Sequence, residues 1–455
     1  MTTQPPAPAP RLRRDRFTLT LDGVFVTWGW LLYSFNPSVP LLAAELRVSN
    51  AQAGLHGTAM AVGAVLAAAV TPRAVLRLGR RTALVAACVL LGAGIGLLVS
   101  GWTLPVTLTG MVVVALGGNV AISAAQAGLV LHHGRTASAA VTEANGVGSG
   151  VGLLGPIAVG ACVAAGWGWR PAVAVTAVLA LATAVAVRLL PTVGALGRAG
   201  GRGRASAGAD GDAGAGGDAS RAEPVGPAVR GGRADPAGPA AGPTATGPAG
   251  AAQASRTARA VLASRWFLVT VVAALALENA TTYWATDLVR DRTGAGAGIA
   301  TATTAGLVAG MTLIRFVVGP LSLRMSPARL LAVSFGVAVA GWAVLWTATD
   351  APVALAGLFL AGLGYGAQYP LGIALLLGAS GGATDAAQAR ATVGGGVAIG
   401  LAPFLLGALA DAVGPHTAFL VVPVLAVVGG VAAVSGGRAW RRERPGVPIA
   451  AGDAA

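Results

Sequence analysis

Long apolar segments joined by short polar turns follow one another along the chain, with one polar interval near its middle. A helix needs about 20 mostly apolar residues to cross the hydrocarbon core of a bilayer. Glycines inside such segments are typical of membrane helices, where small residues allow close helix packing. The pattern predicts an all-α membrane protein with twelve transmembrane helices, six on each side of the polar interval. Their expected spans are 19–43, 52–71, 82–100, 104–131, 142–165, 171–190, 266–288, 298–321, 329–348, 352–378, 388–411 and 416–436.

The polar interval, residues 194–258, consists mainly of Gly, Ala, Pro and Arg and has almost no large apolar side chain. Such a segment cannot bury enough surface to offset the entropy of ordering, so we expect a disordered linker. A flexible tether is favoured, and a regulatory segment is the alternative. The organisation that follows is a tail, a bundle, the linker, a second bundle and a second tail, over residues 1–16, 17–193, 194–258, 259–437 and 438–455.

Arginine is distributed unevenly between the two sides of the predicted membrane domain. The side of the N-terminus holds the arginines of both tails, the linker and the inner loops. Basic residues are retained on the cytoplasmic side, so both termini and the linker are predicted to be cytoplasmic, in a multi-pass protein of the cell membrane. The proline-rich, basic N-terminus leads into a long apolar segment, which predicts an uncleaved first helix. The outer loops hold only Arg47, Arg170, Arg290 and Arg292.

Composition narrows the classes of function. Hydrophobic residues make up 55% of the chain and charged residues only 11%, whereas soluble domains average about 25% charged. The arginines that give the net charge of +14 lie between apolar segments. This distribution indicates contact with the lipid bilayer rather than with nucleic acid. The chain has no lysine, so it lacks the Gly-Lys-Ser/Thr phosphate loop of ATP-driven proteins. Cys88 and Cys162 lie in apolar segments and the histidines are scattered, so we expect no disulfide, metal, cofactor or catalytic cluster.

An internal repeat relates the two predicted bundles. A shift of 247 residues aligns them without a gap, as in carriers built from two pseudo-symmetric bundles with a binding site between them near the membrane midplane. The matched pairs are Gly63 and Gly310, Leu76-Arg77 and Leu323-Arg324, Leu108 and Leu355, Gly110 and Gly357, Leu116-Gly117 and Leu363-Gly364, Pro156 and Pro403, and Gly160 and Gly407.

A basic motif lies between the second and third predicted helices. The segment 72–81 carries Arg77, Gly79, Arg80 and Arg81. It resembles the Gly-x-Leu-x-Asp-Arg-x-Gly-Arg-Arg loop of the major facilitator superfamily, and the resemblance extends over both bundles. It implies a twelve-helix carrier that works by alternating access.

Both copies of this motif depart from the family pattern at its acidic position. The second copy begins at Gly319 and keeps Leu321 and Arg324. Leu76 and Leu323 stand where the family carries the carboxylate that helps to lock the outward-facing state. The resemblance therefore implies an inner-loop motif that lacks the carboxylate by which the family helps to lock the outward-facing state.

Two further resemblances concern the direction of transport. Gly155, Pro156 and Gly160 in the fifth predicted helix form a loose version of the glycine-proline motif of proton antiporters, which favours export. The stretch from Glu278 to Trp284 resembles sugar-permease-like branches of the same superfamily, which favours uptake.

Ionisable side chains inside the predicted helices need a specific reason, because each costs about 2.5–3.5 kcal/mol at the bilayer centre. Glu278 lies about a dozen residues into its helix, near the midplane, with Thr281 and Thr282 one turn further on. Glu278 is the first candidate for proton coupling or substrate contact, with pairing to a neighbouring helix as the alternative. Asp22, early in the first helix, is the second coupling candidate. Arg315, close to a helix end, is a candidate for a structural or gating role.

Neutral polar and aromatic side chains in the apolar segments are candidates for the wall of a substrate cavity. Several of them fall at nearly equivalent places in the two halves, which favours a shared site. The candidates are Tyr33, Asn36, Asn119, Gln126, Asn279, Trp284, Tyr365, Gln368 and Tyr369.

These features predict a non-enzymatic secondary transporter of a small organic molecule, with protons as the coupling ion and a monomeric chain. The expected cavity is poor in charge, which disfavours highly charged substrates. Efflux of an amphipathic drug or metabolite is favoured over proton-coupled uptake of a sugar-like or organic solute. A membrane receptor that keeps the carrier fold without transport is the alternative from another class.

Overall fold

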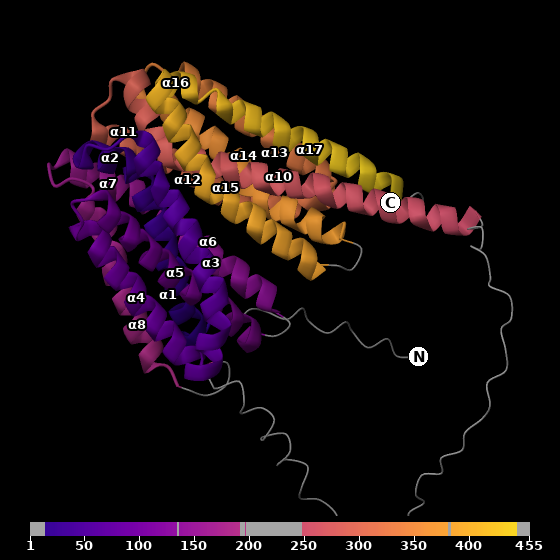
Figure 1. Cartoon of the computed structure of the whole chain (residues 1–455), viewed down its shortest axis with the longest axis horizontal. Coiled ribbons are helices and arrows are strands. Elements are labelled where there is room, and N and C mark those ends of the chain that lie inside the picture. Colours follow the sequence, from indigo (N-terminus) through magenta and orange to yellow (C-terminus); the bar gives the residue numbers. More distant parts are fainter. Residues whose placement is uncertain (1–13, 134–135, 192–195, 197–247, 381–383, 444–455) are drawn as a thin grey trace, which may run out of the picture.

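The computed structural model describes residues 14–133, 136–191, 196, 248–380 and 384–443, which form helices and turns without a strand (Figure 1). The first half comprises α1 (Arg16–Phe35), η1 (Asn36–Ser38), α2 (Val39–Leu46), α3 (Asn50–Leu78), α4 (Arg80–Ser100), α5 (Leu104–His133), α6 (Ala137–Gly152), α7 (Leu154–Ala164) and α8 (Arg170–Leu189). The second half comprises α10 (Pro248–Thr293), α11 (Ala297–Thr303), α12 (Ala305–Arg324), α13 (Pro327–Thr347), α14 (Ala351–Gly378), α15 (Thr384–Val413), α16 (Pro415–Ala418) and α17 (Val421–Glu443).

Helix lengths and hydropathy fit the twelve predicted membrane spans. Eleven segments of the described chain are long and apolar enough to cross a membrane. The remaining span is α1, whose threonines, tryptophans and Asp22 lower its hydropathy. Four spans consist of consecutive short elements: α1 with η1 and α2, α6 with α7, α11 with α12, and α16 with α17.

The structure changes some of the predicted boundaries. Helix α10 begins at Pro248, so residues 248–258, expected in the linker, are helical. The predicted disorder of the rest of the linker lies outside the described residues. The first span changes to a 3-10 turn at η1, where Pro37 lacks the N–H that a continuous α-helix would need.

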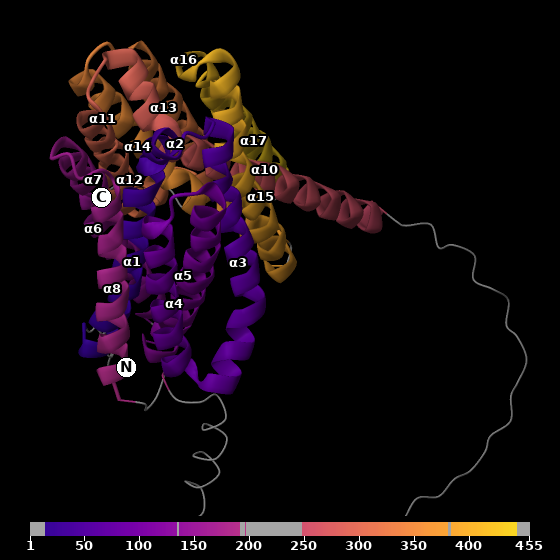
Figure 2. The same cartoon turned by 60° about the vertical axis from the view of Figure 1, so that its left-hand side comes forward.

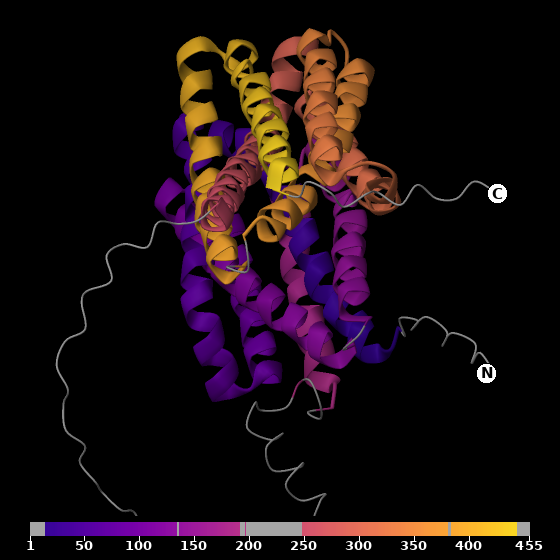
Figure 3. The same cartoon turned by 90° about the vertical axis from the view of Figure 1, so that its right-hand side faces the viewer.

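The two halves meet at one end and diverge toward the other (Figures 1 and 2). We call the meeting end, formed by η1, α2, α7, α11 and the adjoining ends of α3 and α15, the closed end. The contacts between halves join α3 to α15, α7 to α11, and α10 to η1 and α2. The opposite, open end contains the start of α1, the turn between α3 and α4, and the end of α17 (Figure 3). The molecule is therefore a V of two bundles that is shut at one end.

Helix packing inside each half repeats with the 247-residue offset found in the sequence. A Cβ atom on Gly63 would collide with the backbone of Val112, and one on Gly310 with that of Phe359, which is 247 residues after Val112. Three further pairs obey the same rule. Gly94 and Gly341 pack against Val114 and Ala361, Gly110 and Gly357 against Leu98 and Leu345, and Gly117 and Gly364 against Leu91 and Ala338. The halves are thus related by their contacts as well as by their sequence.

Candidate functional site between the two halves

The closed end is held by polar contacts between α3 and α15. The Asp411 carboxylate accepts hydrogen bonds from the backbone N–H groups of Asn50 (2.9 Å) and Ala51 (2.8 Å). These groups open α3, and a carboxylate there satisfies unpaired donors and interacts favourably with the helix dipole. Thr58 of α3 donates to the carbonyl of Gly400 in α15 at 2.5 Å. A residue of the second half thus caps a helix of the first.

A second pair of segments, α7 and α11, approaches closely beside this cap. A Cβ atom on Gly160 would collide with the carbonyl of Gly298, and one on Gly298 with the carbonyl of Gly160. A void of about 10 Å³ lies at this end, lined by Tyr33 and Pro156 of the first half and Thr282 of the second. That volume holds at most one water molecule.

Arg315 of α12 connects the two halves below the closed end. Its guanidinium donates to the hydroxyl of Ser149 in α6 at 2.6 Å and also interacts with the hydroxyl of Tyr33 in α1. The side chain is partly buried. Arg315 therefore has acceptors across the interface between the halves, and its structural or gating role stays a prediction.

Glu278 lies in α10, within electrostatic reach of Arg315. The side chain is partly buried, and the described residues include no hydrogen-bond or ion-pair partner for it. A carboxylate in an apolar bundle without a hydrogen bond is costly, and a cation nearby lowers that cost. Glu278 and Arg315 therefore lie within electrostatic reach of each other at the interface without forming a direct ion pair.

Two tyrosines of α14, Tyr365 and Tyr369, lie within electrostatic reach of Glu278. The hydroxyl of Tyr365 is 2.9 Å from that of Thr281 in α10, and both side chains are buried. Tyr369 is exposed. Gln368 is fully enclosed, and within the described part of the chain neither its side-chain oxygen nor its nitrogen has a hydrogen-bond partner. The three α14 residues predicted to line a cavity thus differ: Tyr365 is hydrogen-bonded, Gln368 is enclosed and Tyr369 is exposed.

The candidates of the first half are more dispersed. Tyr33 is buried and interacts with Arg315. Asn36 is buried at the closed end and donates to the hydroxyl of Thr282 at 3.5 Å, which is a weak bond. Asn119 donates to a carbonyl of its own helix. Gln126 is partly buried further along α5.

Two candidates of α10 have structural partners in this conformation. Asn279 donates to the carbonyl of Leu275 in the same helix at 2.8 Å. Trp284 is 1% exposed, and its indole N–H donates to the carbonyl of Pro403 at 2.8 Å. Trp284 therefore faces the packed interior at the closed end and not the open space between the halves.

Asp22 lies away from the Arg315 cluster. It precedes Tyr33 by eleven residues in α1, which corresponds to about 16 Å along the helix toward the open end. The side chain is 5% exposed, and its Oδ1 atom has no hydrogen-bond partner among the residues that the structure describes. The two coupling candidates thus occupy different places.

The inner-loop motif forms the turn from α3 to α4. Gly79 ends α3 with φ +81°, a conformation that favours glycine, so its place in the motif has a backbone reason. Arg77 is exposed, and Arg80 and Arg81 are partly buried. In the second copy, Gly319 and Arg324 lie within α12, and their side chains are outside the described set.

The helix-5 motif lies at the start of α7. Gly155 packs against the backbone of Tyr33 and Ser34, and Pro156 is buried. Gly160 is the residue that contacts Gly298 of α11. These residues therefore fix the path of the fifth span against α1 and the second half.

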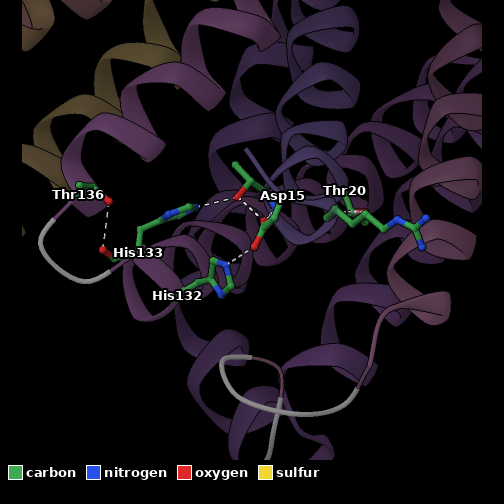
Figure 4. A network of polar contacts seen from close by, with 7 residues as sticks. Asp15, Thr20, His132, His133 and Thr136 are labelled. Atoms are coloured by element: carbon green, nitrogen blue, oxygen red, sulfur yellow. Dashed lines mark hydrogen bonds and ion pairs between the residues drawn. The ribbon is translucent and has the colours of Figure 1, made fainter. Parts of the chain in front are cut away.

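A polar network joins the start of α1 to the end of α5 at the open end (Figure 4). Asp15 caps α1 by accepting from the N–H of Thr18 at 2.9 Å, and its other oxygen is 2.6 Å from Nε2 of His132. Nε2 of His133 is 2.8 Å from the Thr18 hydroxyl. Desolvation alone would raise the pKa of Asp15, but the hydrogen bonds from Thr18 and His132 lower it to about 2. Asp15 therefore stays ionised at neutral pH.

Three contacts escaped the sequence reasoning. Ser149 resembles the small packing residues around it, although it is the one hydroxyl in a run of alternating glycines. Asp411 stands three residues before Gly414, where an acid near a helix end could have been noticed. Glu143, near the start of α6, pairs with Arg14 at 2.6 Å. All three depend on partners far away in the sequence.

Comparison with known proteins identifies the family to which the chain belongs. The model of the Major Facilitator Superfamily matches residues 23–286 and 266–452, so the chain belongs to this superfamily of membrane transporters. No curated protein sequence gives a significant match. The fold and family define a non-enzymatic multi-pass transporter of the secondary type.

Solved structures share the fold at low sequence identity. The nucleoside transporter NupG is 11% identical with a TM-score of 0.64, over 94% of this chain and 98% of that one. A bacterial homologue of the human lysosomal transporter Spinster, in an inward-facing and unoccupied conformation, is 13% identical with a TM-score of 0.67, over 94% and 98%. A D-xylose–proton symporter is 14% identical with a TM-score of 0.66, over 92% and 96%.

Proposed function

We propose that this transporter moves a small organic molecule across the cytoplasmic membrane in exchange for protons, in the direction of efflux. The observation that carries the proposal is the position of Glu278. It is a carboxylate within the membrane, without a hydrogen-bond partner among the described residues, and it lies within electrostatic reach of Arg315. Intramembrane carboxylates of this kind mark ion and proton pathways in transporters.

The proposed coupling uses the two sets of partners of Arg315. When Glu278 is ionised, its charge attracts the guanidinium toward α10. When Glu278 is protonated, that attraction is lost and Ser149 and Tyr33 of the first half hold Arg315 more firmly. Protonation thereby changes the attachment between the halves, and two such states are what alternating access requires.

The open end is proposed to face the cytoplasm, as do both termini. The excess of arginine on the side of the N-terminus supports this orientation. The V is then an inward-facing conformation, the state named for the Spinster homologue. Substrate is proposed to contact the uncharged polar groups around Arg315, among them Tyr33, Tyr365 and Tyr369, while Asp22 remains a second candidate for coupling.

Transport in proteoliposomes tests the proposal. A panel of drugs, sugars and organic acids identifies a ligand that stabilises the purified protein, and its movement is followed with and without an imposed pH gradient. We expect the gradient to drive accumulation, and Glu278→Gln to retain downhill exchange while losing the response to the gradient. Movement that ignores both the gradient and this substitution would reject proton coupling.

Uptake of a sugar-like or organic solute is the alternative direction. Structural neighbours that carry nucleosides and xylose share the fold, and the stretch 278–284 resembles sugar permeases. The same assay separates the two directions, because efflux requires substrate and proton to move oppositely and uptake requires them to move together. Ligand binding without movement in either direction would favour a receptor.

A further inference from the structure

A cavity of about 1060 Å³ lies between α1, α6 and α8, toward the open end of the first half. Asp22, Glu143 and Arg14 line it, and most of the remaining surface is apolar. None of the residues of the Arg315 and Glu278 cluster lines it, although Phe316, which follows Arg315 in α12, does. The cavity therefore adjoins the proposed transport site without being part of it.

The charges in this cavity do not balance. Arg14 binds both carboxylate oxygens of Glu143, at 2.6 and 3.1 Å, so these two groups neutralise each other. Asp22 is 95% buried, and the described residues offer no partner for its Oδ1 atom. With Asp22 ionised, the three groups together carry one net negative charge in a mostly apolar space. A buried carboxylate of this kind is stabilised either by protonation or by a bound cation.

The size and lining of the cavity define the kind of cation. Cavities of about 300–1,000 Å³ accommodate drug-sized molecules. Leu19 and Phe316 are 59% and 66% exposed, so apolar surface is accessible beside the carboxylate. A small hydrated ion would leave that surface in water, whereas an organic cation covers it, and the Phe316 ring offers a cation–π contact.

We propose that this cavity is a binding site for an amphipathic organic cation, with its charge at Asp22 and its apolar body against Leu19, Val147 and Phe316. This inference rests on the proposed function to the extent that it names a substrate class for the same carrier. It adds a second binding place, beside the interface between the halves, and it predicts selection against anions of the same shape.

Equilibrium binding to the purified full-length protein tests the site. The probe is tetraphenylphosphonium, and tetraphenylborate serves as an anion of nearly the same size and shape. We expect saturable binding of the cation, and at least tenfold weaker binding to Asp22→Asn. Asp350→Asn is the matched control, because Asp350 caps α14 far from the cavity and asparagine caps equally well. Its affinity should equal that of the wild type.

A steric variant tests the location independently of charge. Ala182 lines the cavity from α8, so Ala182→Trp should abolish binding while Ala182→Ser preserves it. Each variant is first checked for a monodisperse elution profile. Equal affinity of wild type and Asp22→Asn, equal affinity for the borate, or undiminished binding to a folded Ala182→Trp would each overturn the assignment.

The outcome can be separated from that of the proposed function. Glu278→Gln should bind tetraphenylphosphonium with unchanged affinity while losing gradient-driven transport. Binding that depends on Asp22 in a protein that transports nothing would reject the carrier function and retain the site. Gradient-driven transport in a protein that does not bind the cation would reject the site and retain the carrier.

Discussion

The two halves of this transporter pack their helices through the same contacts but carry different polar groups. Glycines 247 residues apart meet equivalent neighbours in both bundles. The groups that define the interface site have no such equivalents, since charged and aromatic side chains of the second half correspond to small or aliphatic ones of the first. The residues 247 positions before Glu278, Arg315, Tyr365 and Tyr369 are Leu31, Ala68, Gly118 and Ile122. The repeat therefore determines the architecture, and the departures from it determine the chemistry.

The largest effect is expected where the halves are equivalent. Gly110→Leu and Gly357→Leu each insert a side chain against the backbone of a neighbouring helix, at Leu98 and Leu345. Overpacking of this kind costs about 1–3 kcal/mol or more, and a backbone neighbour cannot rotate away. We expect both variants to lose most of their monodisperse protein in size-exclusion chromatography.

Gly96→Leu is the control, because a Cβ at Gly96 meets nothing within 4 Å. It should elute like the wild type. Tolerance of leucine at one of Gly110 and Gly357 but not at the other would show that the two contacts are not equivalent.

The next-largest effect is expected at Arg315, a charged residue that has no charged counterpart in the first half. Arg315→Ala leaves Glu278 without its neighbouring cation, so the initial transport rate should fall at least tenfold in a protein that still folds. Ser149→Ala removes only one hydrogen bond of Arg315, worth about 1 kcal/mol, and should lower the rate about fivefold. Arg329→Ala, at an exposed arginine of α13, should have no effect.

The relative size of the two losses decides between interpretations. If Ser149→Ala is as severe as Arg315→Ala, the bond between the halves matters more than the charge beside Glu278. Full activity of Arg315→Ala would remove the charge pair from the proposed mechanism.

Much of this fold could be predicted from sequence because its determinants are local. Apolar segments of about 20 residues indicated the spans, and the spacing of Gly63, Gly110 and their partners indicated the repeat. The 3-10 turn at η1 and the extension of α10 to Pro248 were not predicted. Hydropathy does not indicate such details, since a 3-10 turn within a span and a polar helical extension leave the length of the apolar segment unchanged.

The site was predictable only in part. Glu278 and Arg315 stand out because charge in an apolar segment requires a reason. Their surroundings depend on which helix faces them, so Ser149 was not recognisable as a partner. Trp284 is of a residue type that often lines cavities, and in this conformation its indole N–H donates to the carbonyl of Pro403 at the closed end.

A smaller effect is expected at the closed end, where the halves differ in one carboxylate. Asp411 caps α3 at Asn50, whereas at the equivalent start of α11 the neighbour of Gly298 is Ala164, which has no carboxylate. Removal of a helix cap costs about 0.5–2 kcal/mol. Asp411→Ala should therefore shift the equilibrium about 2- to 30-fold toward a state that opens this end.

Spin labels at Gln52 and Ala412, in a background that lacks Cys88 and Cys162, report the separation of α3 and α15 at this end. A longer-distance population should grow in Asp411→Ala. Ala164→Ser, at the equivalent position of the other pair, should leave the distribution unchanged. An unaltered distribution in Asp411→Ala would mean that the glycine contacts alone keep this end shut.

The smallest effect is expected at the open end, where Asp15 and His132 join α1 to α5 while the equivalent positions hold Leu262 and Ala379. Asp15→Asn keeps the helix cap and removes the charge, and partly exposed ion pairs contribute about 0.2–1 kcal/mol. We expect a decrease of about 1–3 °C in the apparent melting temperature at pH 7. Leu262→Asn, at an exposed side chain, should change it less.

The pH dependence of this difference has a definite sign. The pKa of Asp15 is lowered from 3.8 to about 2 in the folded protein, so its contribution to stability is complete above pH 3.8 and is lost as the pH falls toward 2. Wild type and Asp15→Asn should therefore differ at pH 5 and converge as the pH falls below 4. Such convergence would assign the junction of α1 and α5 to an ionic contact, in contrast to the apolar cluster around Phe267, Leu376 and Ala379 in the second half. A difference that persists unchanged to pH 3 would instead show that both halves are joined there by packing alone.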